Sequence, residues 1–280
     1  EKLPYLHDDL GASAIWLNPV FAAGSNHRYD TSDYTQVDPH LGGNAALAAL
    51  RAATRERGMR LVLDAVVNHT GADHPWFDRW GRHGGGAASS PRSPFRDRYV
   101  FDAHGYAHGW KGHDSLPVLD YASPAVQRAV YGDDDAVLRR WLREPYAIDG
   151  WRLDVAPWLP HGFWKHWRRT VKAINPEAYL VAENIRDVAF NIPFLQGDEF
   201  DAVMNYNFAF ACDEFFFRER TRITASRFDA LLRELREAYP ACVAPVMQNL
   251  FGSHDTARLA SHAFNRDRLD YRAFDETYHP

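Results

Sequence analysis

The sequence predicts an α/β fold and, among α/β folds, a (β/α)8 TIM barrel. Short apolar runs of strand length alternate with helical stretches along most of the chain, which is typical of parallel βα units. Polar residues follow many of these runs, as they do at one rim of a barrel. An open doubly wound sheet would instead carry a Gly-rich turn after its first strand, and the first run is followed by no such turn.

The expected strands are short and apolar. The run at 61–66 is almost continuously apolar, as in a parallel strand buried on both faces. We expect strands at 14–17, 61–66, 150–155, 179–183, 200–205 and 246–251. We expect helices at 47–57, 124–143, 163–174 and 227–239. Gly58 closes the first helix at the C′ position, Gly132 interrupts the second, and Ser226 caps the last.

Polar side chains lie at or just past the carboxyl ends of the expected strands. They are Asn18, Asp64, Asn68, Asp154, Glu183, Asn205 and Asp255. Because the strands of a barrel all end at the same rim, these residues predict a functional site there.

Residues 69–121 break the alternation and are rich in Gly, His, Asp and Pro. A connection of this length is usually functional or a small inserted subdomain. The glycines at 84–86 are followed by no Lys-Ser/Thr pair and stand in no strand-to-helix turn, so a flexible loop is favoured over a phosphate cradle.

Composition restricts the class of partner. The 280 residues carry a net charge of −5 with scattered Lys and Arg, so neither nucleic acid nor an anionic membrane is an expected partner. The aromatic content leans toward carbohydrate, since sugar sites use aromatic faces. Cys212 and Cys242 match no metal or disulfide spacing, and no secretory or transmembrane run is visible. Two buried thiols and a cytoplasmic location are therefore predicted.

Three carboxylates predict the chemistry. Arg152 and Asp154 stand at i and i+2 of one strand, so both side chains share a face, and the guanidinium can keep Asp154 ionised as a nucleophile requires. A structural ion pair is the alternative. Glu183 ends an apolar strand, where burial and nearby carboxylates favour a raised pKa and a proton-donor role. A His-Asp pair such as His254-Asp255 is more often structural than catalytic when it stands alone. Beside the other two carboxylates, Asp255 would stabilise a cationic transition state or accept hydrogen bonds from substrate hydroxyls.

Two residues near strand three have other expected roles. Asp64 is placed to brace Arg152. Asn68 offers an oxygen suited to Ca²⁺, whereas His69 is not a hard-cation ligand and suits a sugar hydroxyl better.

Four stretches together resemble the conserved segments of the α-amylase family, glycoside hydrolase family 13. They are 64–69, 150–154, Glu183 and 253–255, and the stretches 14–21, 27–34 and 116–120 resemble three more. The resemblance implies an incomplete barrel with strands two to seven present and a small domain B after strand three. The implied division is 1–68 and 122–280 as barrel, with 69–121 as the domain B-like insertion. Since such a barrel lacks two strands, we predict a fragment of a longer polypeptide.

The resemblance also implies residue roles. Asp154 would be the nucleophile, Glu183 the acid/base and Asp255 the transition-state stabiliser. Substrate contacts would come from the following residues: Tyr29, Asp30, Asp64, His69, Arg152, Trp158 and His254. Asn68 matches a position that ligates Ca²⁺ in many amylases, although no cofactor is required by the reaction.

The stretch after Asp154 departs from typical α-amylases. Val155-Ala156-Pro157-Trp158 lacks their Lys-His pair and resembles the neopullulanase, cyclomaltodextrinase and maltogenic-amylase group, or oligo-1,6-glucosidases. Trp158 either walls the leaving-group side or only packs. The implied function is retaining hydrolysis of α-1,4 bonds, with α-1,6 cleavage also compatible, in maltodextrins, cyclodextrins or related α-glucans. A transglycosylase or isomerase such as a trehalose synthase, and a non-catalytic amylase-like subunit, are the alternatives.

Overall fold

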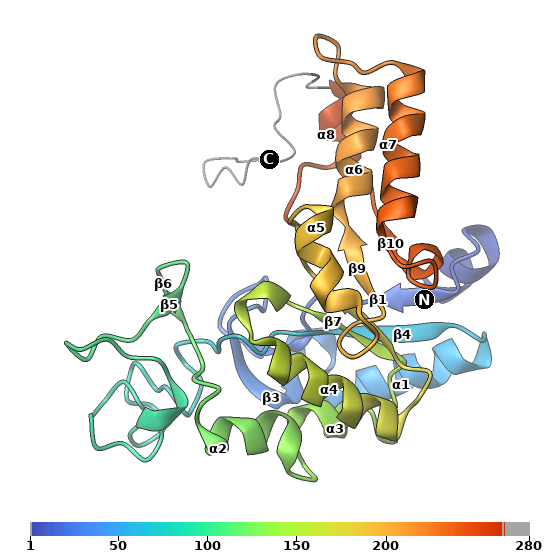
Figure 1. Cartoon of the computed structure of the whole chain (residues 1–280). Helices are drawn as coiled ribbons and strands as arrows, with labels where there is room; N and C mark the ends of the chain where they lie inside the picture. Colours follow the sequence, from blue (N-terminus) through green and yellow to red (C-terminus); the bar gives the residue numbers. More distant parts are fainter. Residues whose placement is uncertain (1, 265, 267–280) are drawn as a thin grey trace. The chain divides into compact units, whose positions relative to one another are not determined.

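The structure is a computed structural model that describes residues 2–264 and 266 (Figure 1). The chain forms two compact units, the first ending at Leu180 and the second beginning at Val181. The boundary falls inside one strand, β8 (Tyr179–Ala182).

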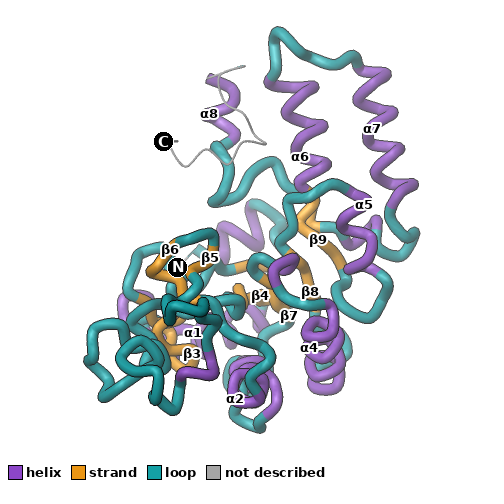
Figure 2. The backbone as a smooth tube through the Cα atoms, turned by 60° about the vertical axis from the view of Figure 1, so that its left-hand side comes forward, coloured by secondary structure: helices purple, strands orange, loops and turns teal. Residues whose placement is uncertain are grey.

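Three parallel strands form the centre of the first unit. They are β1 (Ala14–Trp16), β4 (Arg60–Ala65) and β7 (Gly150–Leu153), paired in that order. Every residue of β7, and all of β4 but the first, is buried, as expected of strands covered on both faces. Figure 2 shows β4 and β7 side by side.

Helices follow these strands as the apolar periodicity predicts. α1 (Gly43–Glu56) is followed by Gly58 with φ +67°, which confirms its closing role. The stretch 124–143 is interrupted as expected. It comprises α2 (Pro124–Gln127), the π-helical turn Arg128–Gly132 and α3 (Val137–Trp141). α4 (His161–Ile174) buries Trp164 and Trp167 in the core.

The insertion at 69–121 contains a short hairpin, β5 (Gly109–Trp110) with β6 (His113–Pro117), and the 3₁₀ turn Arg96–Arg98. It is fixed to the end of β4 by backbone hydrogen bonds, from Leu119 N to Asn68 O (3.0 Å) and from Thr70 N to Pro117 O (3.1 Å). A second hairpin, β2 (Phe21–Ala23) with β3 (Thr31–Val37), precedes α1. The remaining short helical turns of this unit are Tyr5–Asp9, Pro39–Leu41 and Ala156–Trp158.

The second unit continues the βα pattern. β8, β9 (Ala202–Asn205) and β10 (Gln248–Asn249) are parallel neighbours in that order. The helices are α5 (Val188–Asn191), α6 (Tyr206–Cys212), α7 (Ala225–Ala238) and α8 (Leu259–Phe264). Short π or 3₁₀ turns lie at Ile192–Leu195, Asp213–Phe217 and Ala244–Val246.

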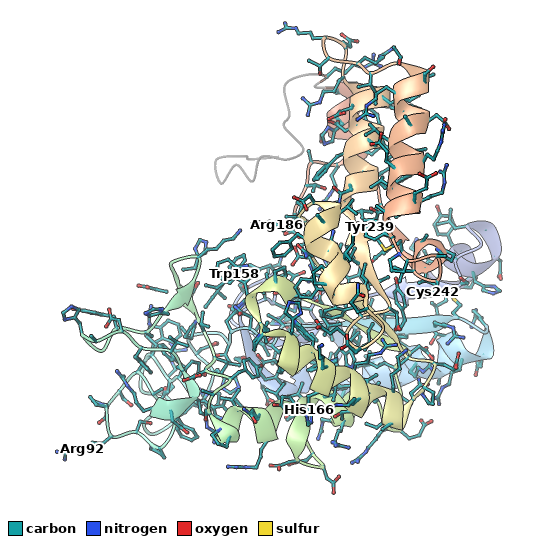
Figure 3. All side chains as sticks on the ribbon, viewed as in Figure 1. Arg92, Trp158, His166, Arg186, Tyr239 and Cys242 are labelled. Carbon is teal, nitrogen blue, oxygen red and sulfur yellow. The ribbon has the colours of Figure 1, made fainter. Side chains whose placement is uncertain are left out.

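Three local expectations are wrong. The strand expected at 246–251 is only Gln248–Asn249, because the 3₁₀ turn that contains Pro245 extends to Val246. The cap of α7 is Thr224, whose hydroxyl accepts a hydrogen bond from Arg227 N at 3.2 Å, and Ser226 lies inside the helix. Cys212 is buried, but Cys242 is exposed (Figure 3), so the prediction of two buried thiols holds for Cys212 alone.

The prediction of an incomplete (β/α)8 barrel is confirmed. The described residues supply three parallel strands in the first unit and three in the second, in agreement with the predicted strands two to seven. In the part of the chain that the structure describes, no helix is long and apolar enough to cross a membrane.

Candidate active site

In the first unit, Arg152 lies on β7 and Asp154 follows the last residue of that strand, and their side chains meet, as the two-residue spacing predicts. Arg152 Nη1 donates a hydrogen bond to Asp154 Oδ1 at 2.7 Å. Both side chains are almost fully buried, with 1% and 6% of their surface exposed. A charge-assisted hydrogen bond in such a place fixes the orientation of the carboxylate.

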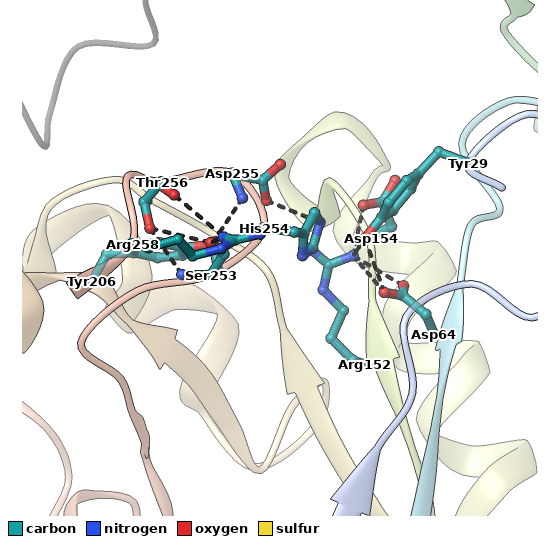
Figure 4. A network of polar contacts seen from close by, with 10 residues as sticks. All are labelled: Tyr29, Asp64, Arg152, Asp154, Tyr206, Ser253, His254, Asp255, Thr256 and Arg258. Atoms are coloured by element: carbon teal, nitrogen blue, oxygen red, sulfur yellow. Dashed lines mark hydrogen bonds and ion pairs between the residues drawn. The ribbon is translucent and has the colours of Figure 1, made fainter. Parts of the chain in front are cut away.

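Asp64 braces Arg152, which confirms the expected contact. Asp64 and Arg152 are direct partners in the parallel register of β4 and β7. Arg152 Nη1 lies 2.9 Å from each carboxylate oxygen of Asp64, whose side chain is fully buried. The Tyr29 hydroxyl joins the group, 3.3 Å from Asp64 Oδ2 and 3.4 Å from Arg152 Nη1 (Figure 4).

Arg152 is shared by two carboxylates, which bears on the alternative of a purely structural ion pair. Asp64, its partner in the strand register, is one of them and Asp154 is the other, and both side chains are buried. One carboxylate would be enough for a structural pair. Asp154 is held in a fixed orientation by the same guanidinium, as a nucleophile would be.

A strained backbone follows Asp154. Val155 adopts φ +41° and ψ +43°, the left-handed region, which is unusual for a β-branched residue. The 3₁₀ turn Ala156–Trp158 begins there and is held by bonds from Trp158 N to Val155 O (2.9 Å) and from Trp164 Nε1 to Ala156 O (2.8 Å). The strand thus ends abruptly at the candidate nucleophile. Such strain is often kept at functional sites.

His69 is a buried, neutral imidazole. Burial lowers the pKa of His69 to about 4, below its ordinary value. Its Nε2 lies 3.2 Å from Tyr29 O, and its Nδ1 lies 3.2 Å from Asn68 Nδ2. Since the Asn68 amide nitrogen can only donate, Nδ1 accepts and Nε2–H donates to the carbonyl of Tyr29. Nε2–H thus helps to position Tyr29, while Nδ1 is held by Asn68. A sugar contact by His69 stays a prediction.

Two further predicted substrate residues of this unit lie outside the Arg152 cluster. Asp30 accepts a hydrogen bond from the Ser25 hydroxyl and lies 3.9 Å from His27 Nδ1. Trp158 is 58% exposed, so the alternative that it only packs in the core is not supported. The sugar-binding roles of both residues stay predictions.

In the second unit, Glu183 directly follows β8 and is half-buried. β8 pairs with β9 in parallel, so Glu183 and Asn205 stand at the carboxyl ends of adjacent strands. Asn205 Nδ2 donates to Asn249 Oδ1 at 2.7 Å, which links the ends of β9 and β10. The strand pattern therefore places Glu183 at the predicted rim of its own unit.

His254 and Asp255 lie on the loop after β10 and form a contact of 3.2 Å between His254 Nε2 and Asp255 Oδ2. The loop is held by Ser253. Its hydroxyl lies 3.0 Å from the buried Tyr206 hydroxyl and accepts from Asp255 N at 3.1 Å (Figure 4). Arg258 donates to the carbonyl of Ser253 as well. The Asp255 backbone is thereby fixed while a third of its side chain stays exposed.

The structure brings together Tyr29, Asp64, Arg152 and Asp154 in the first unit, and His254 with Asp255 in the second. Double displacement requires the nucleophile and the acid/base about 5–5.5 Å apart. That separation for Asp154 and Glu183 stays a prediction.

Asn68 is the predicted calcium ligand. Ca²⁺ takes about six to eight oxygen ligands. The Asn68 amide nitrogen faces His69, so the contact with His69 does not use Oδ1, the atom that would bind Ca²⁺. Among residues 2–264 and 266, no group of three or more His, Cys, Asp or Glu is arranged to hold a metal ion. Calcium at Asn68 therefore stays a prediction.

Comparison with known proteins identifies the family. The profile described as "Alpha amylase, catalytic domain" matches residues 1–276. The chain belongs to the α-amylase family. The prediction of family membership, made from seven short stretches, is thereby confirmed.

Relatives within the α-amylase family include the predicted groups. An amylopullulanase of Thermoanaerobacter thermohydrosulfuricus is 36% identical over 92% of this chain and 19% of its own length. A cyclomaltodextrinase of Geobacillus thermopakistaniensis is 39% identical over 92% of this chain and 42% of its own. The crystal structure of Ttha1563 from Thermus thermophilus has a TM-score of 0.82 and 40% identity, covering 94% of this chain and 57% of that one. The chain thus spans less than half the length of these two curated family relatives.

The sequence did not reveal which residues hold the candidate site residues in place. Tyr34 donates from its hydroxyl to Val66 O at 2.8 Å and to His69 O at 3.0 Å, and so ties β3 to the end of β4. Its pKa is raised well above the ordinary value, chiefly by burial, with Tyr99 and the charge of Asp154 adding to the effect. Tyr206 and Ser253 support Asp255 in the same way. The signals available were the place of Tyr34 in the stretch 27–34 and the place of Ser253 beside His254.

Proposed function

We propose that the parent protein is a retaining glycoside hydrolase that cleaves α-1,4 glucosidic bonds in maltodextrins, cyclodextrins or related α-glucans. Cleavage of α-1,6 bonds is a second activity to be tested together with α-1,4 cleavage. Membership of the α-amylase family and relatives named cyclomaltodextrinase and amylopullulanase support this substrate class.

One observation supports the assignment most strongly. Arg152 is shared by two buried carboxylates, of which Asp64 provides the brace and Asp154 the oriented anion. A nucleophile must be ionised and aimed before substrate arrives, and a fixed guanidinium meets both requirements.

The proposed reaction has two steps. Asp154 attacks the anomeric carbon as the bond to the leaving oxygen breaks, and Glu183 transfers its proton to that oxygen. Glu183 then takes a proton from water, whose oxygen displaces Asp154 from the sugar. Asp255, anchored through Ser253, would stabilise the oxocarbenium-like transition states. Configuration is retained because the two displacements each invert the anomeric carbon.

The test uses the full-length protein with cyclodextrin, pullulan, starch and isomaltose as substrates. The Asp154→Asn variant keeps the shape of the side chain and one oxygen for Arg152, but it removes the nucleophilic charge. We expect turnover to fall by at least about 10⁴-fold, as in other enzymes that lose a nucleophile. Unchanged turnover would end the assignment of Asp154.

Product analysis on maltotriose completes this test. NMR of the first-formed product reports the anomeric configuration, and an inverted product would refute double displacement. Products longer than maltotriose would show that a sugar hydroxyl takes the place of water. The protein would then be a transglycosylase that uses the same residues.

A further inference from the structure

The connection between β8 and α5 has Glu183 at its beginning and Asp187 at its end. β8 ends at Ala182, so the position of the Glu183 carboxyl group depends on how the connection is held. Asp187 fixes the far end, because its Oδ1 accepts a hydrogen bond from Phe190 N at 2.9 Å and so caps α5. The middle of the connection, around Arg186, is held by asparagine side chains.

The backbone of Arg186 forms hydrogen bonds through both its N–H and its carbonyl. The N–H donates to Oδ1 of the buried Asn184 at 3.1 Å. The carbonyl oxygen accepts from Asn191 Nδ2, at the end of α5, at 3.2 Å and from Asn207 Nδ2, on α6, at 3.1 Å. Because a carbonyl oxygen has two lone pairs, the two amides occupy both. The chain is therefore fixed at a point three residues after Glu183.

Tyr239, the buried residue that follows α7, joins the two amides (Figure 3). Its hydroxyl oxygen accepts a hydrogen bond from Asn191 Nδ2 at 3.4 Å. Burial raises the pKa of Tyr239, and hydrogen bonds from the amides of Asn191 and Asn207 oppose that rise. We call Asn191, Asn207 and Tyr239 the amide clamp. Through it, α5, α6 and the end of α7 meet at the carbonyl of Arg186.

We propose that the amide clamp positions the proton that Glu183 gives to the leaving oxygen, so that Asn207 and Tyr239 are positioning residues of the general acid. This inference rests on the proposed function, in which Glu183 is the acid/base. A proton donor must come within hydrogen-bond reach of its acceptor, about 2.6–3.2 Å, and a misplacement of about 1 Å can cost about 10²-fold in rate. The clamp consists of two amides and a hydroxyl, so it acts on Glu183 through position and adds no charge.

The proposal predicts a dependence on the leaving group. A sugar would leave maltotriose as a strongly basic alkoxide, so cleavage needs the proton from Glu183. Fluoride ion is a weak base and leaves α-glucosyl fluoride without a proton. With both substrates, kcat/KM covers the steps up to the attack of Asp154 and the release of the leaving group. A loosened clamp should therefore lower kcat/KM on maltotriose and spare it on the fluoride.

The experiment measures kcat/KM of the full-length protein on maltotriose and α-glucosyl fluoride, with the unfolding midpoint in parallel. For Asn207→Ala we expect kcat/KM to fall about ten- to hundredfold on maltotriose and to stay within about twofold on the fluoride. Asn207 is half-buried and alanine suits a helix, so α6 should persist. Tyr239→Phe keeps the ring but removes the shared oxygen, and it should show a smaller loss of the same kind. Glu183→Gln is the reference for complete loss of the proton and should lower kcat/KM on maltotriose by about 10²–10⁴-fold.

Gln196→Ala is the matched control, because Gln196 Nε2 also donates to a backbone carbonyl of the second unit, that of Ile192, at 2.7 Å. It should leave kcat/KM unchanged on both substrates. Equal losses on maltotriose and the fluoride in Asn207→Ala would overturn the proposal, since the clamp would then support the fold and not the proton transfer. Unchanged constants on both substrates would overturn it too. Full activity of Glu183→Gln on maltotriose would refute the proposed function itself, and with it the proton that the clamp is inferred to position.

Discussion

Removing the guanidinium of Arg152 tests the charge balance of the candidate site. Arg152→Met keeps the length and apolar stem of the side chain but leaves Asp64 and Asp154 without their shared cation. Breaking a buried pair by deleting one partner costs about 3–5 kcal/mol of folding free energy. We expect the upper part of this range, because two buried carboxylates, with 0% and 6% of their side-chain surface exposed, lose the guanidinium that they share.

A buried pair elsewhere in the first unit provides the control. Arg51 Nη1 lies 2.7 Å from Asp149 Oδ2, and the two side chains are 6% and 13% exposed. Asp149 also accepts a hydrogen bond from Leu61 N at 2.7 Å, so its charge keeps a partner after Arg51→Met. We expect that control to cost about 1–3 kcal/mol and to leave activity largely intact.

The assay is thermal unfolding of the full-length protein, followed by calorimetry, with turnover measured in parallel. Arg152→Met should lower the unfolding midpoint by roughly 6 °C or more and abolish turnover. The double variant Arg152→Met/Asp64→Asn should regain stability, because one uncompensated carboxylate is gone, but should stay inactive. Equal stability losses in Arg152→Met and Arg51→Met, or a double variant less stable than Arg152→Met, would refute the reasoning.

Three further predictions concern protonation, a buried contact and metal dependence. Burial lowers the pKa of His69 to about 4 in the folded protein, so below about pH 6.5 the unfolded chain binds more protons than the folded one. The free energy of unfolding should therefore fall by roughly 3 kcal/mol between about pH 6.5 and pH 4. His69→Gln should remove this fall when unfolding by urea is measured across that pH range. His262 Nδ1 lies 3.0 Å from Asp213 Oδ1, and both side chains are buried, so this contact should anchor α8. His262→Ala should therefore raise the rate of amide hydrogen exchange in α8 at least about fivefold, and an unaltered rate would contradict the anchoring role. EDTA tests the predicted calcium at Asn68: a bound Ca²⁺ stabilises the native state, so its removal should lower the unfolding midpoint, and an unchanged midpoint would contradict calcium there.

The alternation of side chains between the two faces of a strand explains why part of the site could be predicted from sequence. Arg152 and Asp154 share a face because side chains alternate along a strand, and the parallel register then sets Asp64 beside Arg152. These are short-range rules that single stretches of sequence obey. The barrel followed from the same alternation of strands and helices, whereas its incompleteness followed from the family resemblance, and three parallel strands in each unit agree with both.

The rest depends on contacts that no local pattern encodes. Trp110 lies on a hairpin about fifty residues before Trp158 in the chain, and only the folded insertion brings the two rings together. Thr224 and Ser226 are both good caps, and the extended backbone at Thr224 decides between them. The last strand is short because a proline-containing turn competes with it, which apolar content alone does not reveal.

The left-handed Val155 has a consequence for engineering. β7 ends just before Asp154, and the turn that follows is fastened to α4 by the hydrogen bond from Trp164 Nε1 to Ala156 O. We therefore expect variants at Pro157 and Trp158 to leave the candidate nucleophile in place. Substitutions at Val155, whose left-handed conformation begins the turn, are expected to shift both Asp154 and the turn.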